Sequence, residues 1–196
     1  HGLRFLAEAN YFEMQDQIYP PHVVDTLRSL SRDDVILREQ YLDFLKFRRF
    51  RQTLLCHQSV QLEYSPRPAR IRDFYISSAA RPVSDNPNIT SASAVEQFRG
   101  PKGAAMATDH SLAKAAMLCL GDVWPLALPF DDLARRACMR IGADYRQDMP
   151  EAEALCQILL GTYAAGLVEL HVRPPRCVTN VSPCPTASPL ARLQLE

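Results

Sequence analysis

The residues of this chain best placed for nucleophilic chemistry are the adjacent Cys56 and His57. A catalytic cysteine needs a base within hydrogen-bond reach, and histidine commonly serves. Both residues, however, end a short apolar run that predicts a β-strand, where neighbouring side chains point to opposite faces. We therefore expect no Cys–His dyad and no catalytic residue. His22, His110 and His171 stand alone in the sequence, and we expect each to be structural or solvated.

The six cysteines could in principle bind zinc or form disulfides. Structural zinc sites need closely spaced ligand pairs, and the sequence contains no Cys-x-x-Cys pair. We therefore expect free thiols and no metal site. Cys177 and Cys184 could be joined only if the Pro-rich tail were oxidised, which a reducing cytoplasm disfavours.

A nucleotide-type cofactor would require a glycine-rich turn between a strand and a helix. The seven glycines are scattered. Gly100 and Gly103 come close together, but they lack the full glycine spacing and the GK[ST] ending of a phosphate-binding loop. The sequence predicts a turn here, no cofactor site, and a chain that is not itself an enzyme.

Positive charge and an aromatic side chain combine at one corner, Arg48-Arg49-Phe50-Arg51. The preceding residues from Asp34 have helical periodicity, and Thr53 to Cys56 predict a strand. On the helix, the residues expected on the buried face are Leu37, Tyr41, Phe44, Leu45 and Arg48. Those expected mostly on the opposite side are Arg38, Glu39, Asp43, Lys46 and Arg49.

Arginine and aromatic residues are the typical anchors of protein interfaces. We therefore expect the corner and the exposed side of the preceding helix to contact a partner. The candidate interface residues are Tyr41, Asp43, Arg48, Arg49, Phe50 and Arg51. For Asp43 we prefer a structural alternative, an ion pair with Arg48 or Arg51 that holds the corner.

Two stretches carry a family resemblance, and their matching positions are Gly2, Leu3, Leu6, Glu8, Ala9, Gln40, Tyr41, Asp43, Phe44, Arg48, Phe50, Arg51, Leu54 and Leu55. This pattern resembles the predicted regulatory domain beside the catalytic domain of certain bacterial S-adenosylmethionine-dependent methyltransferases. The part from about Asp109 looks like the winged-helix-like segment that follows it in relatives, which include protein lysine methyltransferases. The family domain normally continues upstream of His1, so the resemblance implies an internal fragment.

Composition sets further bounds. The chain has 196 residues, of which 47% are hydrophobic, enough for one or two globular domains. Its formal net charge is zero, which removes the strongest argument for a nucleic-acid partner. It has no start Met, signal peptide or apolar run of about 20 residues, so we expect a fragment of a bacterial cytoplasmic protein with no membrane partner. Leu195-Glu196 could be a vector scar.

Short elements are predicted in the first half of the chain. Residues 3–9 favour a strand and residues 22–30 a helix. Residues 71–76 also alternate like a strand. Residues 77–93, rich in Ser, Pro, Asn and Ala, predict a loop-rich linker that continues to the turn at 100–103.

The second half has the clearest helical periodicity. Three helices are predicted, with apolar faces formed by Leu112, Ala115, Ala116 and Cys119, then Phe130, Leu133, Ala134, Ala137, Cys138 and Ile141, then Ala152, Leu155, Cys156, Leu159, Leu160 and Tyr163. A strand follows at 167–172, with Val168, Leu170 and Val172 directed inward. Three helices followed by a strand suggest a winged-helix-like arrangement.

A winged-helix DNA-binding module is the alternative function. A recognition helix normally brings Arg, Lys, Asn or Gln to DNA. The third helix, 148–165, carries three acidic residues and no Lys or Arg, and only Gln157 could contact a base. Arg135, Arg136 and Arg140 on the preceding helix suit a solvated face equally well. Nucleic acid is therefore not the expected partner.

The sequence thus predicts an α+β chain with three parts: a truncated regulatory domain with strands and linker at 1–98, a winged-helix-like, mainly helical domain at 104–175, and a Pro-rich tail at 176–196. The resemblance implies a non-catalytic regulatory or substrate-recognition region acting on an adjacent catalytic domain of the same polypeptide. S-adenosylmethionine would bind that catalytic domain, and a protein substrate is a further possible partner.

Overall fold

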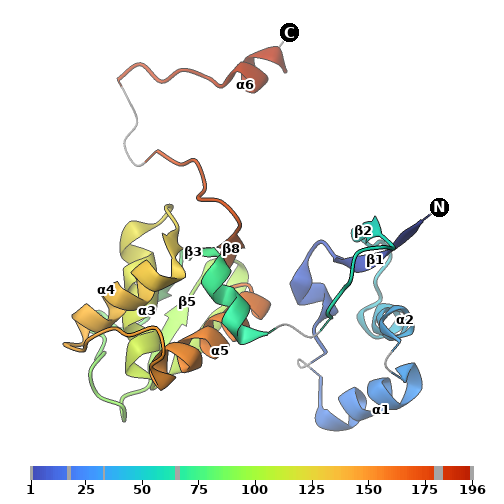
Figure 1. The fold of residues 1–196 in the computed structure, drawn as a ribbon, viewed down its shortest axis with the longest axis horizontal. Helices are drawn as coiled ribbons and strands as arrows, with labels where there is room; N and C mark the ends of the chain where they lie inside the picture. Colours follow the sequence, from blue (N-terminus) through green and yellow to red (C-terminus); the bar gives the residue numbers. More distant parts are fainter. Residues whose placement is uncertain (1, 17–18, 33, 65–66, 179–182, 195–196) are drawn as a thin grey trace.

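The structure is a computed structural model that describes residues 2–16, 19–32, 34–64, 67–178 and 183–194. It mixes helices and strands, so the predicted α+β class is confirmed. Figure 1 shows two bodies, with a tail leading away from the second. We call them the N-terminal unit (elements within residues 3–57) and the helical unit (elements within residues 68–171). Within the described residues, no helix has the length and apolar character needed to cross a membrane.

The N-terminal unit is a two-stranded sheet with two α-helices. Strand β1 (Leu3–Glu8) pairs antiparallel with β2 (Thr53–His57), and the register shifts between Phe5 and Ala7. The 3-10 helix η1 (Tyr11–Met14) follows β1 in the chain, and helices α1 (Pro21–Ser31) and α2 (Val35–Lys46) come next, before β2. The two α-helices pack on each other. The strands predicted at 3–9 and 53–56 and the helix at 22–30 are confirmed.

Helix α2 has well-defined ends. At its start the Asp34 carboxylate accepts hydrogen bonds from the backbone N–H groups of Ile36 at 2.9 Å and Leu37 at 3.0 Å. At its end Phe47 adopts a left-handed conformation with φ 50°. Because such a residue turns the chain sharply, the corner residues that follow leave the helix axis immediately.

The face that α2 buries differs from the prediction. Its buried residues are Glu39 and Leu42, whereas Phe44 is 76% exposed and Leu45 is also exposed. The predicted assignment of Phe44 and Leu45 to the interior and of Glu39 to the surface is therefore wrong. The physical reason is that Glu39 has an arginine partner inside the unit, which periodicity of apolar residues cannot reveal.

The helical unit contains two small antiparallel sheets and three helices. One sheet has the order β7 (Leu128–Pro129), β3 (Tyr75–Ser77), β8 (Glu169–His171), and the other the order β4 (Arg81–Pro82), β5 (Glu96–Arg99), β6 (Ala105–Thr108). The helices are α3 (Ser111–Val123), α4 (Phe130–Arg140) and α5 (Pro150–Ala164). Two 3-10 helices, η2 (Pro68–Asp73) and η3 (Pro101–Gly103), complete the unit.

The core of this unit includes the predicted apolar faces of the three helices and further residues that the periodicity did not mark. Its largest members are Ile71, Ile76, Phe98, Leu112, Met117, Leu120, Phe130, Leu133, Leu155 and Leu159. Each such side chain contributes about 1.5–3 kcal/mol when fully buried. The three predicted helices are confirmed. Ile71, Ile76 and Phe98 belong to the same core, although they lie within the part predicted as the first domain, 1–98. The division into domains stays a prediction.

Three local expectations are corrected here. Residues 71–76 do not form one strand, because Ile71 ends up inside η2 and only Tyr75–Ser77 pair in a sheet. The predicted linker contains the paired strands β4 and β5, which with β6 form the second sheet. Val172, predicted to point inward, lies beyond β8 and is exposed.

The winged-helix likeness stays a prediction for this unit. The central strand of its first sheet is β3, which precedes the three helices in the chain, while β7 and β8 flank it. After β8 the chain runs along the Pro-rich tail to the short helix α6 (Pro189–Leu193), which carries exposed Leu190 and Leu193. Leu195 and Glu196, named above as a possible vector scar, lie outside the described residues.

Candidate interaction site

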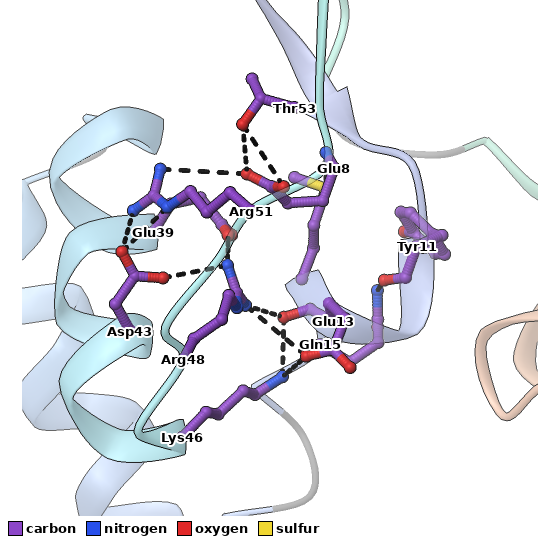
Figure 2. A network of polar contacts seen from close by, with 11 residues as sticks. Glu8, Tyr11, Glu13, Gln15, Glu39, Asp43, Lys46, Arg48, Arg51 and Thr53 are labelled. Carbon is purple, nitrogen blue, oxygen red and sulfur yellow. Dashed lines mark hydrogen bonds and ion pairs between the residues drawn. The ribbon is translucent and has the colours of Figure 1, made fainter.

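The corner between α2 and β2 divides its side chains between the interior and the surface. Arg48 and Arg51 turn into the N-terminal unit, where they meet carboxylates from β1 and α2, as Figure 2 shows. Arg49 and Phe50 are exposed, and Phe50 retains 90% of its accessible surface. The six candidate interface residues are thus not one surface.

Arg48 is the centre of the interior cluster, with only 9% of its side chain exposed. Its Nη1 lies 3.2 Å from Glu39 Oε2 and 3.1 Å from Asp43 Oδ1. Its Nη2 donates a hydrogen bond of 2.7 Å to the backbone carbonyl of Glu13. Lys46 Nζ donates to the same carbonyl at 2.6 Å. Arg48 therefore joins α2 to η1.

Arg51 makes the second set of contacts. Its Nε and Nη2 donate to the same oxygen of Asp43, Oδ2, at 2.8 and 2.6 Å. Its Nη1 lies 3.9 Å from Glu8 Oε1, and the Thr53 hydroxyl donates to that oxygen at 3.2 Å. Asp43 thus pairs with both arginines, as in the structural alternative preferred from the sequence. We call Glu8, Glu39, Asp43, Arg48 and Arg51 the corner cluster.

The electrostatics of the cluster follow from its burial. Glu39 is 0% exposed, and burial raises the pKa of its carboxyl, an effect that the hydrogen bond from Arg48 partly offsets. Desolvation lowers the pKa of Lys46, against the attraction of Glu13. The pKa of Arg51 is raised, mainly by its hydrogen bonds to Asp43. The pKa values of Glu39, Lys46 and Arg51 thus depend on the charged groups beside them.

The surface beside the cluster is aromatic. Phe47 is 87% exposed and, with Phe44 and Phe50, places three phenyl rings at the end of α2 and the corner. Tyr41 and Phe44 both line an open hollow of about 320 Å³ between α1 and α2. Phe44 also lines a second hollow with Phe47, whereas Phe50 lines a third beside Arg51. Large exposed apolar groups gathered in one region commonly mark an interaction surface. We call Phe44, Phe47, Arg49 and Phe50 the aromatic corner.

Sequence reasoning missed several of these roles. Glu8, Glu13 and Lys46 were not among the candidates, because the contacts of Glu8 with Arg51 and of Glu13 with Lys46 and Arg48 join segments far apart in the chain. Phe47 carried no signal either, since only the left-handed helix end makes it protrude.

One serine–histidine contact resembles part of a hydrolase site. Ser77 Oγ lies 2.9 Å from His171 Nε2, and Glu169 Oε2 lies 3.6 Å from that same nitrogen. In a catalytic triad the carboxylate holds the opposite ring nitrogen, so these three residues do not form a relay. They are cross-strand neighbours of β3 and β8.

Other groups considered from the sequence are not brought together. Cys56 and His57 are consecutive residues of β2, and all six cysteines are free thiols. In the described part of the chain no three His, Cys, Asp or Glu side chains are grouped as metal ligands. On α4, Arg135 pairs with Asp132 and Arg140 with Asp122, each at 2.6 Å.

Comparison with known proteins gives the class to which the N-terminal unit is related. Residues 1–57 match the family described as "Predicted methyltransferase regulatory domain". This match confirms the resemblance inferred from the residues of this stretch.

Particular relatives are found in Rickettsia. Over 76 residues the chain is 38% identical to uncharacterized protein RP789 of Rickettsia prowazekii (strain Madrid E). The aligned segment covers 39% of this chain and 13% of that relative. It is 22% identical over 157 residues to uncharacterized protein RP027 of the same organism, covering 78% of the chain and 62% of that relative. The chain therefore spans only part of either relative's length.

Two solved structures share the fold. The structure of PKMT2 from Rickettsia typhi matches with a TM-score of 0.75 and 22% identity, covering 92% of this chain and 36% of that one. The same protein in complex with AdoHcy matches with a TM-score of 0.73 and 20% identity, covering 92% and 35%. The likeness extends through both units and accounts for about a third of the PKMT2 chain.

Proposed function

We propose that this chain is a regulatory or substrate-recognition region of a protein methyltransferase, and that it acts on a catalytic domain of the same polypeptide. The observation that carries the proposal is the family match of residues 1–57. The fold shared with PKMT2, a protein whose structure has also been solved in complex with AdoHcy, supports it. In this proposal S-adenosylmethionine binds the catalytic domain, the acceptor is a lysine of a protein substrate, and this chain transfers no methyl group.

The aromatic corner is the proposed contact surface. Phe47 and Phe50 are nearly as exposed as free side chains, and Arg49 lies between them in the sequence. Burial of an exposed phenylalanine in a partner's surface contributes about 1.5–3 kcal/mol, and aromatic and arginine side chains dominate interface energies. Arg48 and Arg51 contribute indirectly, because the corner cluster holds the backbone from which these rings project.

Nothing in the charge distribution favours DNA as the partner. The described side chains of α5 include Glu151 and Glu153 and no cation, and two of the three arginines of α4 are engaged by aspartates. Duplex binding depends on cations free to contact phosphates.

The proposal is tested with the full-length methyltransferase carrying Phe47→Ser and Phe50→Ser together. Methyl transfer to the protein acceptor should fall by about tenfold or more, the effect of losing one strong interface anchor. The thermal midpoint should stay unchanged, because neither ring packs in the interior. Val172→Ser is the matched control, since it removes another apolar side chain that is mostly exposed, just after β8. Methyl transfer at the wild-type rate in the double variant would refute the proposed surface.

A further inference from the structure

One aromatic contact joins the two units. The ring of Tyr11, in η1, stacks on the ring of Tyr163, in the last turn of α5, with centroids 5.5 Å apart and planes 14° from parallel. Such a pair adds a modest, orientation-dependent attraction to the burial of its rings. The stack thus connects the element that follows β1 to the longest helix of the other unit.

The surroundings of the stack are loosely packed. A hollow of about 510 Å³ lies on one part of its perimeter and includes Phe74 and Leu160, and a hollow of about 740 Å³ lies on another and includes Asn10 and Gly166. Both tyrosines line both hollows. With open hollows on two sides, the stack is a small contact in which the rings have room to shift.

The position of η1 is set from the other side by the corner. The Glu13 carbonyl, two residues after Tyr11, accepts hydrogen bonds from Lys46 Nζ at 2.6 Å and from Arg48 Nη2 at 2.7 Å (Figure 2). The backbone N–H of Glu8 contacts Met14 Sδ at 3.3 Å. The short helix that carries Tyr11 is therefore tied to the end of α2 by two charged donors.

We infer that η1 is a conformational link that passes the state of the corner cluster to the helical unit. A displacement of Arg48 moves the Glu13 carbonyl, η1 follows because it spans one turn, and the Tyr11 ring changes its contact with Tyr163. The proposed function supplies what displaces Arg48, a partner seated on the adjoining aromatic corner. The link itself is a property of this chain and is measured without a partner.

Amide hydrogen exchange in the last turns of α5, residues 158–166, tests this link in the isolated chain. Tyr11→Leu removes the ring and should speed exchange there by about 2- to 12-fold, the factor that corresponds to the strength of an aromatic pair. Arg48→Lys keeps the charge but replaces the planar guanidinium, whose Nη1 and Nη2 contact Glu39 and Glu13 separately, by a single ammonium that does not reproduce this geometry. It should have the same effect at a distance. Arg49→Lys, the matched exposed neighbour, should have none.

The route is tested by combining Arg48→Lys with Tyr163→Leu. Once the stack is gone, the arginine substitution should add nothing to the exchange of α5. Unchanged α5 exchange in Arg48→Lys, or an equal response with and without Tyr163, would overturn the link. Protection of α2 amides shows whether the N-terminal unit is folded, and Lys46→Met, which removes the other donor to Glu13, replaces Arg48→Lys if that protection is lost. Failure of the proposed function would appear only in methyl transfer and would leave this exchange pattern intact.

Discussion

Replacing Arg48 by Met is the most severe single test of the corner cluster. The substitution retains most of the buried volume but removes the cation that faces Glu39, which has no exposed surface. Removing one partner of a buried pair typically costs about 3–5 kcal/mol, because the other charge is left without compensation. Total stability of a domain is about 5–15 kcal/mol, so the N-terminal unit should lose a large part of it.

The loss should depend on pH. Burial raises the pKa of Glu39 above its ordinary value of 4.5, and the opposing effect of Arg48 disappears in the variant, so the pKa rises further. A carboxyl with a raised folded-state pKa stabilises the fold below its ordinary pKa and loses that contribution as pH rises through the folded value. The variant should therefore be closest to wild type near about pH 5 and most destabilised near about pH 8.

Urea unfolding followed by circular dichroism at both pH values measures this effect. The double variant Glu39→Leu with Arg48→Met, which removes both charges, should recover most of the lost stability. Arg49→Met is the control and should change stability by less than about 0.5 kcal/mol. A loss under about 1 kcal/mol for Arg48→Met at pH 8, or a double variant less stable than the single one, would contradict an uncompensated Glu39 charge.

Two further predictions concern the helical unit. Lys114 is fully buried, and its Nζ donates to two backbone carbonyls of the 84–95 loop at 2.7 and 2.9 Å, so Lys114→Met should lower stability by about 2–3 kcal/mol and make that loop a site of limited proteolysis. Gly100→Ala would place a methyl group 2.9 Å from the packed Leu167 side chain and should lower the free energy of unfolding by about 1 kcal/mol. Gly161→Ala, in open space within α5, should raise it by about 1 kcal/mol, and thermal unfolding measures both changes.

The fold was predictable where burial follows a helical period. Phe130, Leu133 and Ala137 are all fully buried on α4, as their spacing requires. Short strands gave no such signal. Residues 96–99 and 105–108 are four residues each and flank a Gly-Pro turn, so their pairing as β5 and β6 depends on a sheet that only the folded chain contains.

The candidate site was predictable in location but not in orientation. The helix-to-strand corner is where the sequence placed it, and Asp43 pairs with Arg48 and Arg51 as the preferred alternative had it, but the remaining partners of these arginines were not predicted. Their partners include Glu8 and Glu13, which lie 35 or more residues earlier. Apolar periodicity also assigned Phe44 to the interior, because a ring exposed for a partner and a ring buried in a core look alike in sequence.

The central claim is that this chain acts on a methyltransferase catalytic domain through the aromatic corner. The most direct measurement is methyl transfer by the catalytic domain expressed alone, over a panel of protein acceptors, with this chain added as a separate folded protein. The account predicts that the wild-type chain changes the rate or the choice of acceptor and that the Phe47→Ser, Phe50→Ser chain does not. Identical rates and acceptors with and without the folded wild-type chain would contradict it.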